Sequence, residues 1–452
     1  PQTPTLPHPL RNMKLPTNNN IHLTYCTNIH PGEEWDKVFA NLKQYIPSLK
    51  TRLANHELLT SITTENSFPP HPTPHTPHPV SFGIGLRLAD VATRELLRGN
   101  ALAEFQSWLS EENLYVFTLN GFPFGGFHRQ IVKDQVYAPD WSKPERLEYT
   151  LRLVHILAQL LPVGIEGSIS TLPLSYKPWF QGNQLSQTAV TSSATFHLAQ
   201  LVAEMVKIKN NTGKVLHLDL EPEPDGLIEN AAEVIDYFQT HLLSVGGEYL
   251  AQQLRISQKA AEAYLLDHIR ICYDTCHFAV EYEDPAIVFQ QFQAAGIQIG
   301  KIQISAALQV DIPSNLEKRR LVKERLLPFA ESTYLHQVIA RDRNGQLRHY
   351  QDLEKALPDI ESTTASQWRI HFHVPIFIRD YQLLQSTQDD ITTVLDLLKN
   401  KNVCNHLEIE TYTWEVLPQE MKLDLPASLQ REYEWVLSKM LATNSNELAF
   451  VK

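Results

Sequence analysis

The sequence predicts a (β/α)8 TIM barrel with insertions. Short apolar runs of strand character alternate with helical patterns along most of the 452 residues. Alternation of this kind is typical of a parallel sheet covered by helices, and eight such units close a barrel. Hydrophobic residues make up 43% of the chain and charged residues 20%, enough apolar side chains for one large core. Several late strands also end in carboxylates or imidazoles, as barrel active sites do.

Nine segments have strand character, one more than a barrel requires. The predicted strands are 21–27, 82–88, 114–120, 164–171, 215–223, 270–274, 300–305, 368–377 and 407–413. The predicted helices are 34–53, 91–109, 144–161, 195–209, 230–243, 285–295 and 389–399. An Asn-Gly pair at Asn344 lies between alternating residues, which predicts a small hairpin inserted outside the barrel near 337–350.

We expect one barrel domain over residues 13–442. The proline-rich residues 1–12 are expected to form a flexible extension, and residues 443–452 a C-terminal tail. Residues 68–79 (FPPHPTPHTPHP) contain six prolines and predict an extended loop.

Composition excludes several classes of protein. The chain has 51 acidic and 39 basic residues, a formal charge of −12, so we expect no nucleic-acid partner. No apolar run reaches 18 residues, so we expect a protein that is not embedded in a membrane. Four cysteines in so long a chain do not form a disulfide scaffold. A cytoplasmic location follows as an expectation.

Alternation along four strands gives each one apolar and one polar face, because residues two apart share a face. The polar faces carry His217, Asp219, Glu221 and Glu223; Lys301, Gln303 and Ser305; His371 and His373; and Glu408, Glu410 and Tyr412. In a barrel covered by helices the polar face must point into the lumen, where unpaired carboxylates are costly. Carboxylates and imidazoles that converge at strand ends predict a divalent-metal site.

A second signal follows the predicted strand 270–274. Asp274 ends this strand and His277 follows three residues later, so both can point at the same barrel mouth. The D-x-x-H spacing is weak by itself, and a helix-capping aspartate beside an unrelated histidine is the alternative. The strand context, shared with Glu221 and Glu410, favours the functional interpretation.

These positions resemble the xylose isomerase-like TIM barrels, a superfamily of sugar isomerases, ketose epimerases and endonucleases. The resemblance implies metal ligands at Glu221, Asp274 and Glu410, with His277 completing the D-x-x-H. Gln303 stands where the family usually has a histidine ligand. His371 or His373, one predicted strand later, would substitute for it.

More closely, the chain resembles the EboE metabolite-traffic family, best known from a cyanobacterial gene cluster. The resemblance implies a barrel, a cytosolic place, and a role in making or moving a secondary-metabolite precursor toward export, with membrane proteins of the same pathway as partners. It rests on residues 22–31 (HLTYCTNIHP), 83–88 (GIGLRL), 120–126 (NGFPFGG), 136–141 (VYAPDW), 168–173 (SISTLP), 274–277 (DTCH), 301–305 (KIQIS), 371–375 (HFHVP) and 410–414 (ETYTW).

The expected function is isomerisation or epimerisation of a sugar or sugar-phosphate-like metabolite with a divalent metal (Mn, Co, Zn or Mg). Glu221 and Glu410 would exchange a carbon-bound proton, and His277 would hydrogen-bond the substrate. Further substrate contacts are predicted at Asn28, His30, Asn120, His128, Lys177, Glu223, Lys301, Gln303 and Trp414. The alternative is a non-catalytic carrier that binds a small polar metabolite in the same barrel. An endonuclease is disfavoured by the acidic charge and the single D-x-x-H.

Overall fold

The computed structural model describes residues 21–54, 81–128, 131–415, 417 and 424–441. The predicted N-terminal extension (1–12), proline-rich loop (68–79) and C-terminal tail (443–452) lie outside the described residues.

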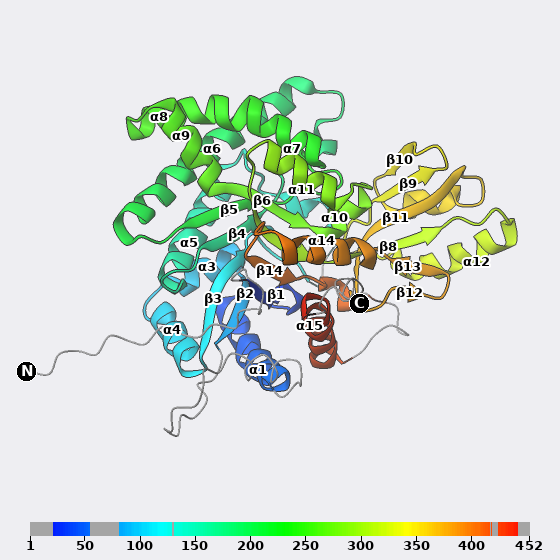
Figure 1. The fold of residues 1–452 in the computed structure, drawn as a ribbon, viewed down its shortest axis with the longest axis horizontal. Coiled ribbons are helices and arrows are strands. Elements are labelled where there is room, and N and C mark those ends of the chain that lie inside the picture. Colours follow the sequence, from blue (N-terminus) through cyan, green and yellow to red (C-terminus); the bar gives the residue numbers. More distant parts are fainter. Residues whose placement is uncertain (1–20, 55–80, 129–130, 416, 418–423, 442–452) are drawn as a thin grey trace, which may run out of the picture.

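Eight parallel strands form the central sheet, which confirms the predicted barrel (Figure 1). Each strand begins and ends close to a predicted one. In sheet order they are β1 (His22–Tyr25), β14 (His406–Ile409), β7 (Ile299–Ile304), β6 (Ile269–Asp274), β5 (Leu216–Leu220), β4 (Gly167–Thr171), β3 (Leu114–Asn120) and β2 (Phe82–Arg87).

The barrel closes between β1 and β2 largely through a threonine side chain. The Thr24 hydroxyl accepts a hydrogen bond from Gly85 N (2.8 Å) and donates one to Gly83 O (3.0 Å). Beyond it, a single parallel bridge joins Cys26 to Gly85. A Cβ at Gly85 would lie 1.8 Å from Glu408 Oε1, so only glycine leaves room for that carboxylate in the lumen.

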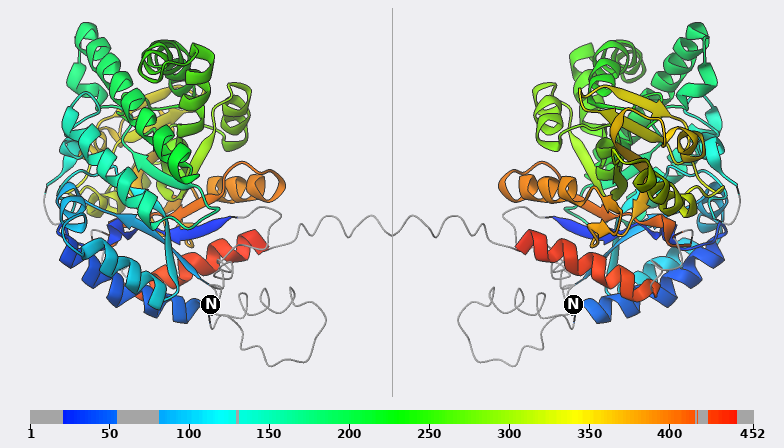
Figure 2. Two further views of the ribbon diagram at one scale, coloured as in Figure 1. Left: turned by 90° about the vertical axis from the view of Figure 1, so that its left-hand side faces the viewer. Right: turned by 90° about the vertical axis from the view of Figure 1, so that its right-hand side faces the viewer.

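Helices surround the strands as a continuous ring, each in contact with the next. The side views show α1 and α15 lying side by side, where the last helix of the ring meets the first (Figure 2). The ring contains α1 (Trp35–Ala54), α3 (Asp90–Leu96), α5 (Pro144–Leu160), α6 (Gln184–Thr212), the π-helix η4 (Phe238–Gly246), α7 (Ala231–Tyr237), α11 (Pro285–Ala294), α14 (Gln388–Asn400) and α15 (Leu425–Leu441). Outside or between its members lie α4 (Ala101–Glu111), α8 (Gly247–Leu254), α9 (Gln258–His268) and α10 (Thr275–Val280). The predicted helix 91–109 is two helices, because Gly99 has a positive φ of 55° and breaks it.

A second, antiparallel sheet is inserted between β7 and α14 and projects from the barrel (Figure 1). The surplus predicted strand, 368–377, is β11 of this sheet and is not part of the barrel. The sheet order is β10 (Leu347–Tyr350), β9 (Val338–Asp342), β11 (Ala365–Val374), β8 (Ala306–Asp311), β13 (Leu384–Ser386) and β12 (Asp380–Tyr381), with α12 (Leu316–Leu326) and α13 (Leu353–Ala356) in the connections. Strands β9 and β10 pair as an antiparallel hairpin around Asn344.

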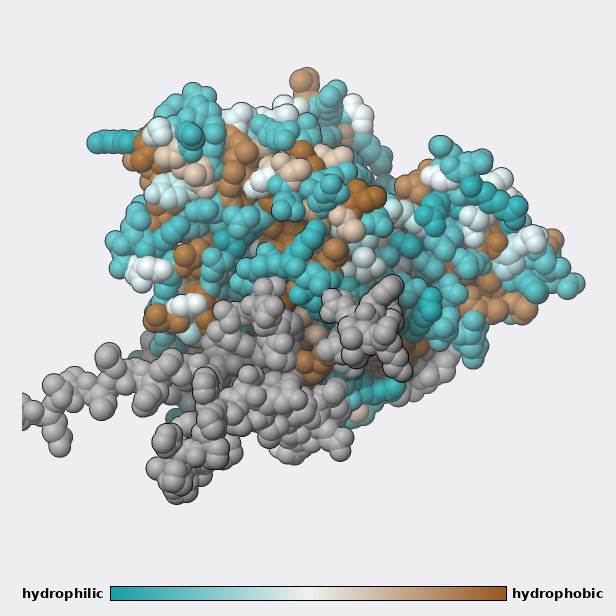
Figure 3. All heavy atoms as spheres, in the orientation of Figure 1, coloured by the Kyte–Doolittle hydropathy of each residue, from teal (hydrophilic) through white to brown (hydrophobic). Residues whose placement is uncertain are grey.

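The surface seen in the orientation of Figure 1 is mainly hydrophilic over the inserted sheet (Figure 3). Among the described residues, no helix combines the length and the apolar character that a membrane crossing demands.

Candidate metal centre

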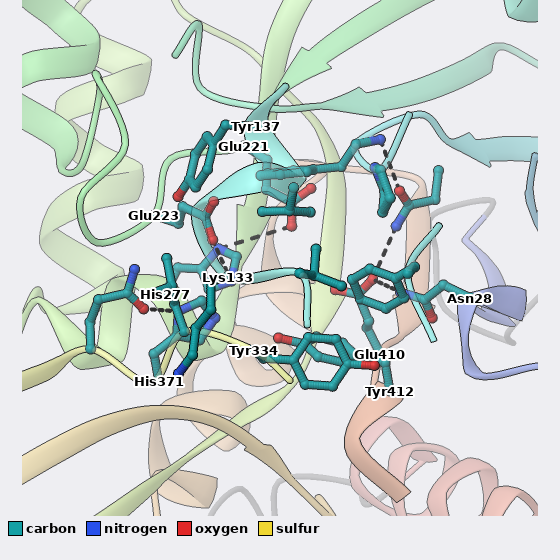
Figure 4. A pocket seen from close by; sticks show the side chains of 18 residues that line it. Asn28, Lys133, Tyr137, Glu221, Glu223, His277, Tyr334, His371, Glu410 and Tyr412 are labelled. Carbon is teal, nitrogen blue, oxygen red and sulfur yellow. Dashed lines mark hydrogen bonds and ion pairs between the residues drawn. The ribbon is translucent and has the colours of Figure 1, made fainter. Parts of the chain in front are cut away.

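A pocket of about 600 Å³, including its open mouth, lies where the carboxyl ends of the barrel strands face the inserted sheet (Figure 4). Its floor carries the carboxylates and imidazoles predicted from strand alternation. Glu221 follows β5, Asp274 ends β6 and Glu410 follows β14, so three different strands bring them to one place. One oxygen of each lies within 4.8 Å of the others.

Asp274 uses one carboxylate oxygen to hold the local backbone and leaves the other free. Its Oδ1 accepts hydrogen bonds from Cys276 N (2.8 Å), His277 N (3.0 Å) and the Ser305 hydroxyl (2.6 Å). This is the helix-capping role, and it coexists with a functional one, because Oδ2 is buried without a hydrogen-bond partner.

Glu410 is held by two side-chain amides on one oxygen. Asn28 Nδ2 donates to Glu410 Oε1 at 2.7 Å, and Asn120 Nδ2 donates to the same oxygen at 3.0 Å. Both asparagines line the pocket, and their hydrogen bonds orient the Glu410 carboxylate. Glu221 Oε2 is a further buried oxygen without a partner.

Three histidines complete the floor, and each has Nδ1 occupied. His373 Nδ1 donates to Glu410 O (2.8 Å) and His277 Nδ1 to Pro222 O (3.2 Å). His371 Nδ1 donates to Gln337 Oε1 (2.9 Å). Because carbonyl oxygens only accept, Nδ1 carries the proton, and Nε2 of each neutral ring presents a lone pair. A fixed tautomer of this kind is the usual arrangement of a metal-binding histidine.

The free lone pairs point toward one another. His373 Nε2 lies 4.0 Å from Asp274 Oδ2, and neither atom has a hydrogen-bond partner. His277 Nε2 lies 3.8 Å from Glu223 Oε2 and 3.9 Å from Asp274 Oδ1. The ring centroids of His277 and His371 are 4.6 Å apart. Asp274 is a member of two groups of possible metal ligands, and so is His277. The groups overlap and form a continuous row from Glu221 to His371.

Burial sets the protonation of these groups in the absence of a cation. It raises the pKa of Glu221 well above its usual range, and the neighbouring carboxylates of Glu410 and Asp274 raise it further. Burial also raises the pKa of Glu223 to about 8. It lowers the pKa of His277 and of His371 well below the usual range, with nearby histidines adding to the effect.

The donor set fits a divalent cation. Acceptors that face acceptors in a buried site are unfavourable unless a proton or a cation lies between them. Imidazole nitrogens together with carboxylates suit zinc, manganese or cobalt, whereas magnesium prefers oxygen ligands. Glu221, Asp274 and Glu410 form one group of ligands close enough to hold an ion, and Asp274, His277 and His373 form an overlapping group. Glu223, His277 and His371 form a further group of three on the same floor.

Below this floor lies a polar layer in which Lys301 and Glu408, and His217 and Asp219, are paired with each other. Lys301 and Glu408, both fully buried, form an ion pair, and the Lys301 ammonium also donates to the Ser170 hydroxyl at 3.3 Å. Burial disfavours the charge on Lys301, but Glu408 more than offsets this and raises the lysine pKa. Gln303 is also fully buried here, with neither amide atom hydrogen-bonded. Lys301 and Gln303 were predicted to contact substrate, and the structure places both beneath the pocket.

Four other predicted contacts lie away from the pocket floor, and the first three have a local partner. His30 stacks on Tyr45, with ring centroids 4.3 Å apart, and hydrogen-bonds the Tyr25 hydroxyl. Lys177 pairs with Glu229 at 2.6 Å. His128 hydrogen-bonds Asn28 O, and Trp414 is a buried ring that does not line the pocket.

The sequence analysis missed several residues that line the pocket. Tyr137 ends the short 3-10 helix η2 (Lys133–Tyr137), Tyr334 lies in a loop and Gln337 directly precedes β9, where no strand or helix period marks a side chain as inward. Tyr137 hydrogen-bonds Glu223. The Asn-Gly hairpin signal near Gln337 located the insertion but not its packing against the barrel mouth.

Comparisons with known proteins give distant likenesses to solved structures. No protein-family model and no curated protein matches the chain. It is similar to the solved structure of the IolI protein with a bound zinc atom (11% identity, TM-score 0.43, 94% of this chain and 100% of that one). It is also similar to D-psicose 3-epimerase in the presence of D-fructose (11%, 0.41, 92% and 97%). A xylose isomerase domain-containing protein from Salmonella typhimurium is a third (9%, 0.39, 93% and 98%).

Proposed function

We propose that this protein is a divalent-metal-dependent isomerase or epimerase of a polyol or hydroxy-carbonyl metabolite. The observation that carries the proposal is the facing pair of buried lone pairs on His373 Nε2 and Asp274 Oδ2, 4.0 Å apart. Glu221, Asp274, Glu410 and His373 would hold the cation. When bound, it would polarise a substrate carbonyl or hydroxyl.

The chain supplies the groups that move the proton. Glu221 and Glu410 end different strands and both line the pocket, so a substrate between them can lose a carbon-bound proton to one carboxylate and regain it from the other. Asn28 and Asn120 fix the orientation of Glu410 through its Oε1. His277, with Nδ1 donating to Pro222 O, orients a substrate hydroxyl through Nε2.

A non-catalytic carrier is the competing proposal, and the pairing in the lumen argues against it. A carrier without a metal would have to neutralise the carboxylates of the floor with protons or with internal cations. The buried cation nearest in the lumen, Lys301, pairs with Glu408 instead. Asp219 takes its hydrogen bond from His217 at 2.6 Å. Among the described residues, Glu221 and Asp274 have no ion pair with a lysine or arginine.

The pathway is a further proposal that rests on sequence resemblance. The segments that resemble the EboE metabolite-traffic family suggest a cytoplasmic protein that makes or moves a secondary-metabolite precursor, together with membrane partners of the same pathway. Copurification of the tagged full chain from its own host tests these partners.

The decisive experiment measures metal content by elemental mass spectrometry on the full chain purified without chelator. We expect at least about one Zn, Mn, Co or Mg per chain, and loss of at least one equivalent in Glu221→Gln. Glu166→Gln is the matched control, because Glu166 is half-exposed and pairs with Arg270 outside the pocket. With the metal present, exchange of solvent deuterium into ketoses and other hydroxy-carbonyl compounds, at the carbon next to the carbonyl, should stop in Glu221→Gln and Glu410→Gln. A wild-type chain that takes up no metal would refute the proposal.

A further inference from the structure

We infer that the substrate of this centre is amphiphilic, with a polar head on the floor and an apolar body against the walls, and is not phosphorylated. The inference rests on the proposed function and adds the substrate class. It comes from the contrast between the two zones of the pocket. The floor is built of carboxylates, imidazoles and amides, whereas the walls are aromatic and aliphatic.

Three aromatic rings form the wall opposite the carboxylates. The ring centroids of Phe127, Tyr334 and Tyr412 are 5.1 to 5.3 Å from one another, and Tyr334 and Tyr412 lie together in Figure 4. Val132 packs against Phe127 and Tyr334 in the same cluster. We call Phe127, Val132, Tyr334 and Tyr412 the aromatic collar. Because such rings attract apolar groups, the collar provides a contact surface for an apolar ligand segment.

The collar is assembled from three distant parts of the chain and is held in place by backbone contacts. Phe127 and Val132 follow β3, Tyr334 precedes β9 in the insertion, and Tyr412 follows β14. The amides of Val132 and Lys133 both donate to Thr333 O, at 2.8 and 3.1 Å. The barrel loop is therefore tied to the inserted sheet across the pocket mouth.

The charges around the pocket disfavour a phosphate. Four carboxyl groups surround the floor, those of Glu221, Glu223, Asp274 and Glu410, so oxygen acceptors face any anion that enters. Among the described residues, Lys133 is the lysine that lines the pocket, no arginine lines it, and the Lys133 ammonium is already paired with Asp352 at 2.6 Å. Phosphate sites instead use free cations or backbone amides.

The test uses hydroxamic acids, because this head group chelates divalent metals whatever is attached to it. Acetohydroxamic, hexanohydroxamic and phosphoglycolohydroxamic acids are titrated calorimetrically into the metal-loaded full chain. Each buried methylene should tighten binding by about threefold to fourfold, so the hexanoyl compound should bind at least about tenfold tighter than the acetyl one. The phosphorylated compound should bind no tighter than the acetyl one.

Two variants of one loop locate the effect. Phe127→Ala should reduce the hexanoyl-to-acetyl affinity ratio severalfold. Ile131→Ala, which removes a 73% exposed side chain outside the pocket, should leave the ratio unchanged. Equal affinity for the two chain lengths, or tighter binding of the phosphorylated compound, would overturn the inference. Metal content is measured on the same samples, so a chain that holds no metal identifies failure of the proposed function instead.

Discussion

Two polar layers in one barrel lumen differ in how their members are satisfied. In the lower layer Lys301 pairs with Glu408, and His217 donates to Asp219. In the upper layer Asp274 Oδ2 and His373 Nε2 face each other unpaired. Both layers are buried, and two chain segments contribute to both of them: Asp219 precedes Glu221, and Glu408 precedes Glu410, by two residues. The difference teaches that burial alone does not mark a functional group, whereas a cluster of buried ligand atoms that face one another without partners points to one.

Small residues allow the lower layer to pair. A Cβ at Gly300 would lie 2.1 Å from Asp219 Oδ1 and 2.7 Å from His217 Nδ1, so the glycine leaves room for that pair. Gly85 does the same for Glu408. The two charged pairs of the lower layer are thus formed without a ligand.

The largest expected effect comes from breaking the lower ion pair. Lys301→Met leaves the Glu408 carboxylate buried and unpaired, which should lower the free energy of unfolding by about 3–5 kcal/mol. Glu221→Gln in the upper layer of the metal-free protein should cost less than about 1 kcal/mol, because no partner is lost. Urea unfolding of both variants measures the contrast. The double variant Lys301→Met/Glu408→Gln should recover much of the loss, and equal effects of the two single variants would remove the distinction between the layers.

The pH dependence of the free energy of unfolding should be of intermediate size, and a bound metal should change it for Glu223 in the upper layer but not for Glu432 on α15. Burial raises the pKa of each carboxyl to about 8. A raised folded-state pKa gives stability that is complete below the unfolded value near 4.5 and is lost as the pH rises through 8. The metal-free protein should therefore lose up to about 1.4 kcal/mol per pH unit for each such group in this window.

Replacing either residue by glutamine should flatten that slope in the metal-free protein. With saturating metal, Glu432→Gln should still flatten it and Glu223→Gln should not, because a bound cation favours the ionised Glu223. Chemical unfolding between pH 6.5 and 8 gives the slopes. Identical behaviour of the two variants with metal would place Glu223 outside the metal centre.

The smallest expected effect concerns a neutral hydrogen bond of the lower layer. His22 Nδ1 and the Tyr115 hydroxyl are 2.8 Å apart in the buried lumen. Tyr115→Phe should lower the free energy of unfolding by about 1 kcal/mol. A double-mutant cycle with His22→Phe should give a coupling energy of similar size, whereas additive losses would show that the pair is not a unit.

The barrel and the carboxylates at its mouth could be predicted from the sequence alone. Alternation along 215–223 and 407–413 indicates which side chains face inward, and parallel strands place their carboxyl ends at one edge. Glu221, Asp274 and Glu410 therefore come together as expected from local pattern alone. Strand 368–377 has the same alternation but pairs antiparallel with β8 and β9. Alternation of apolar and polar residues shows which face of a strand is buried, but it does not show which sheet the strand joins.

The remaining residues of the barrel mouth could not be predicted from the sequence, because they come together only in the folded chain. His371 and His373 reach the pocket from the inserted sheet, and Tyr334 packs against Phe127 from another loop. Such contacts join residues far apart along the chain through loops, where side-chain direction has no period. Ion pairing also depends on the folded structure. Alternation predicts that Lys301 and Glu221 both face the lumen. Their different positions along the barrel axis place Lys301 beside Glu408 and leave Glu221 Oε2 without a hydrogen-bond partner. Satisfaction of a buried charge depends on the neighbours that folding supplies.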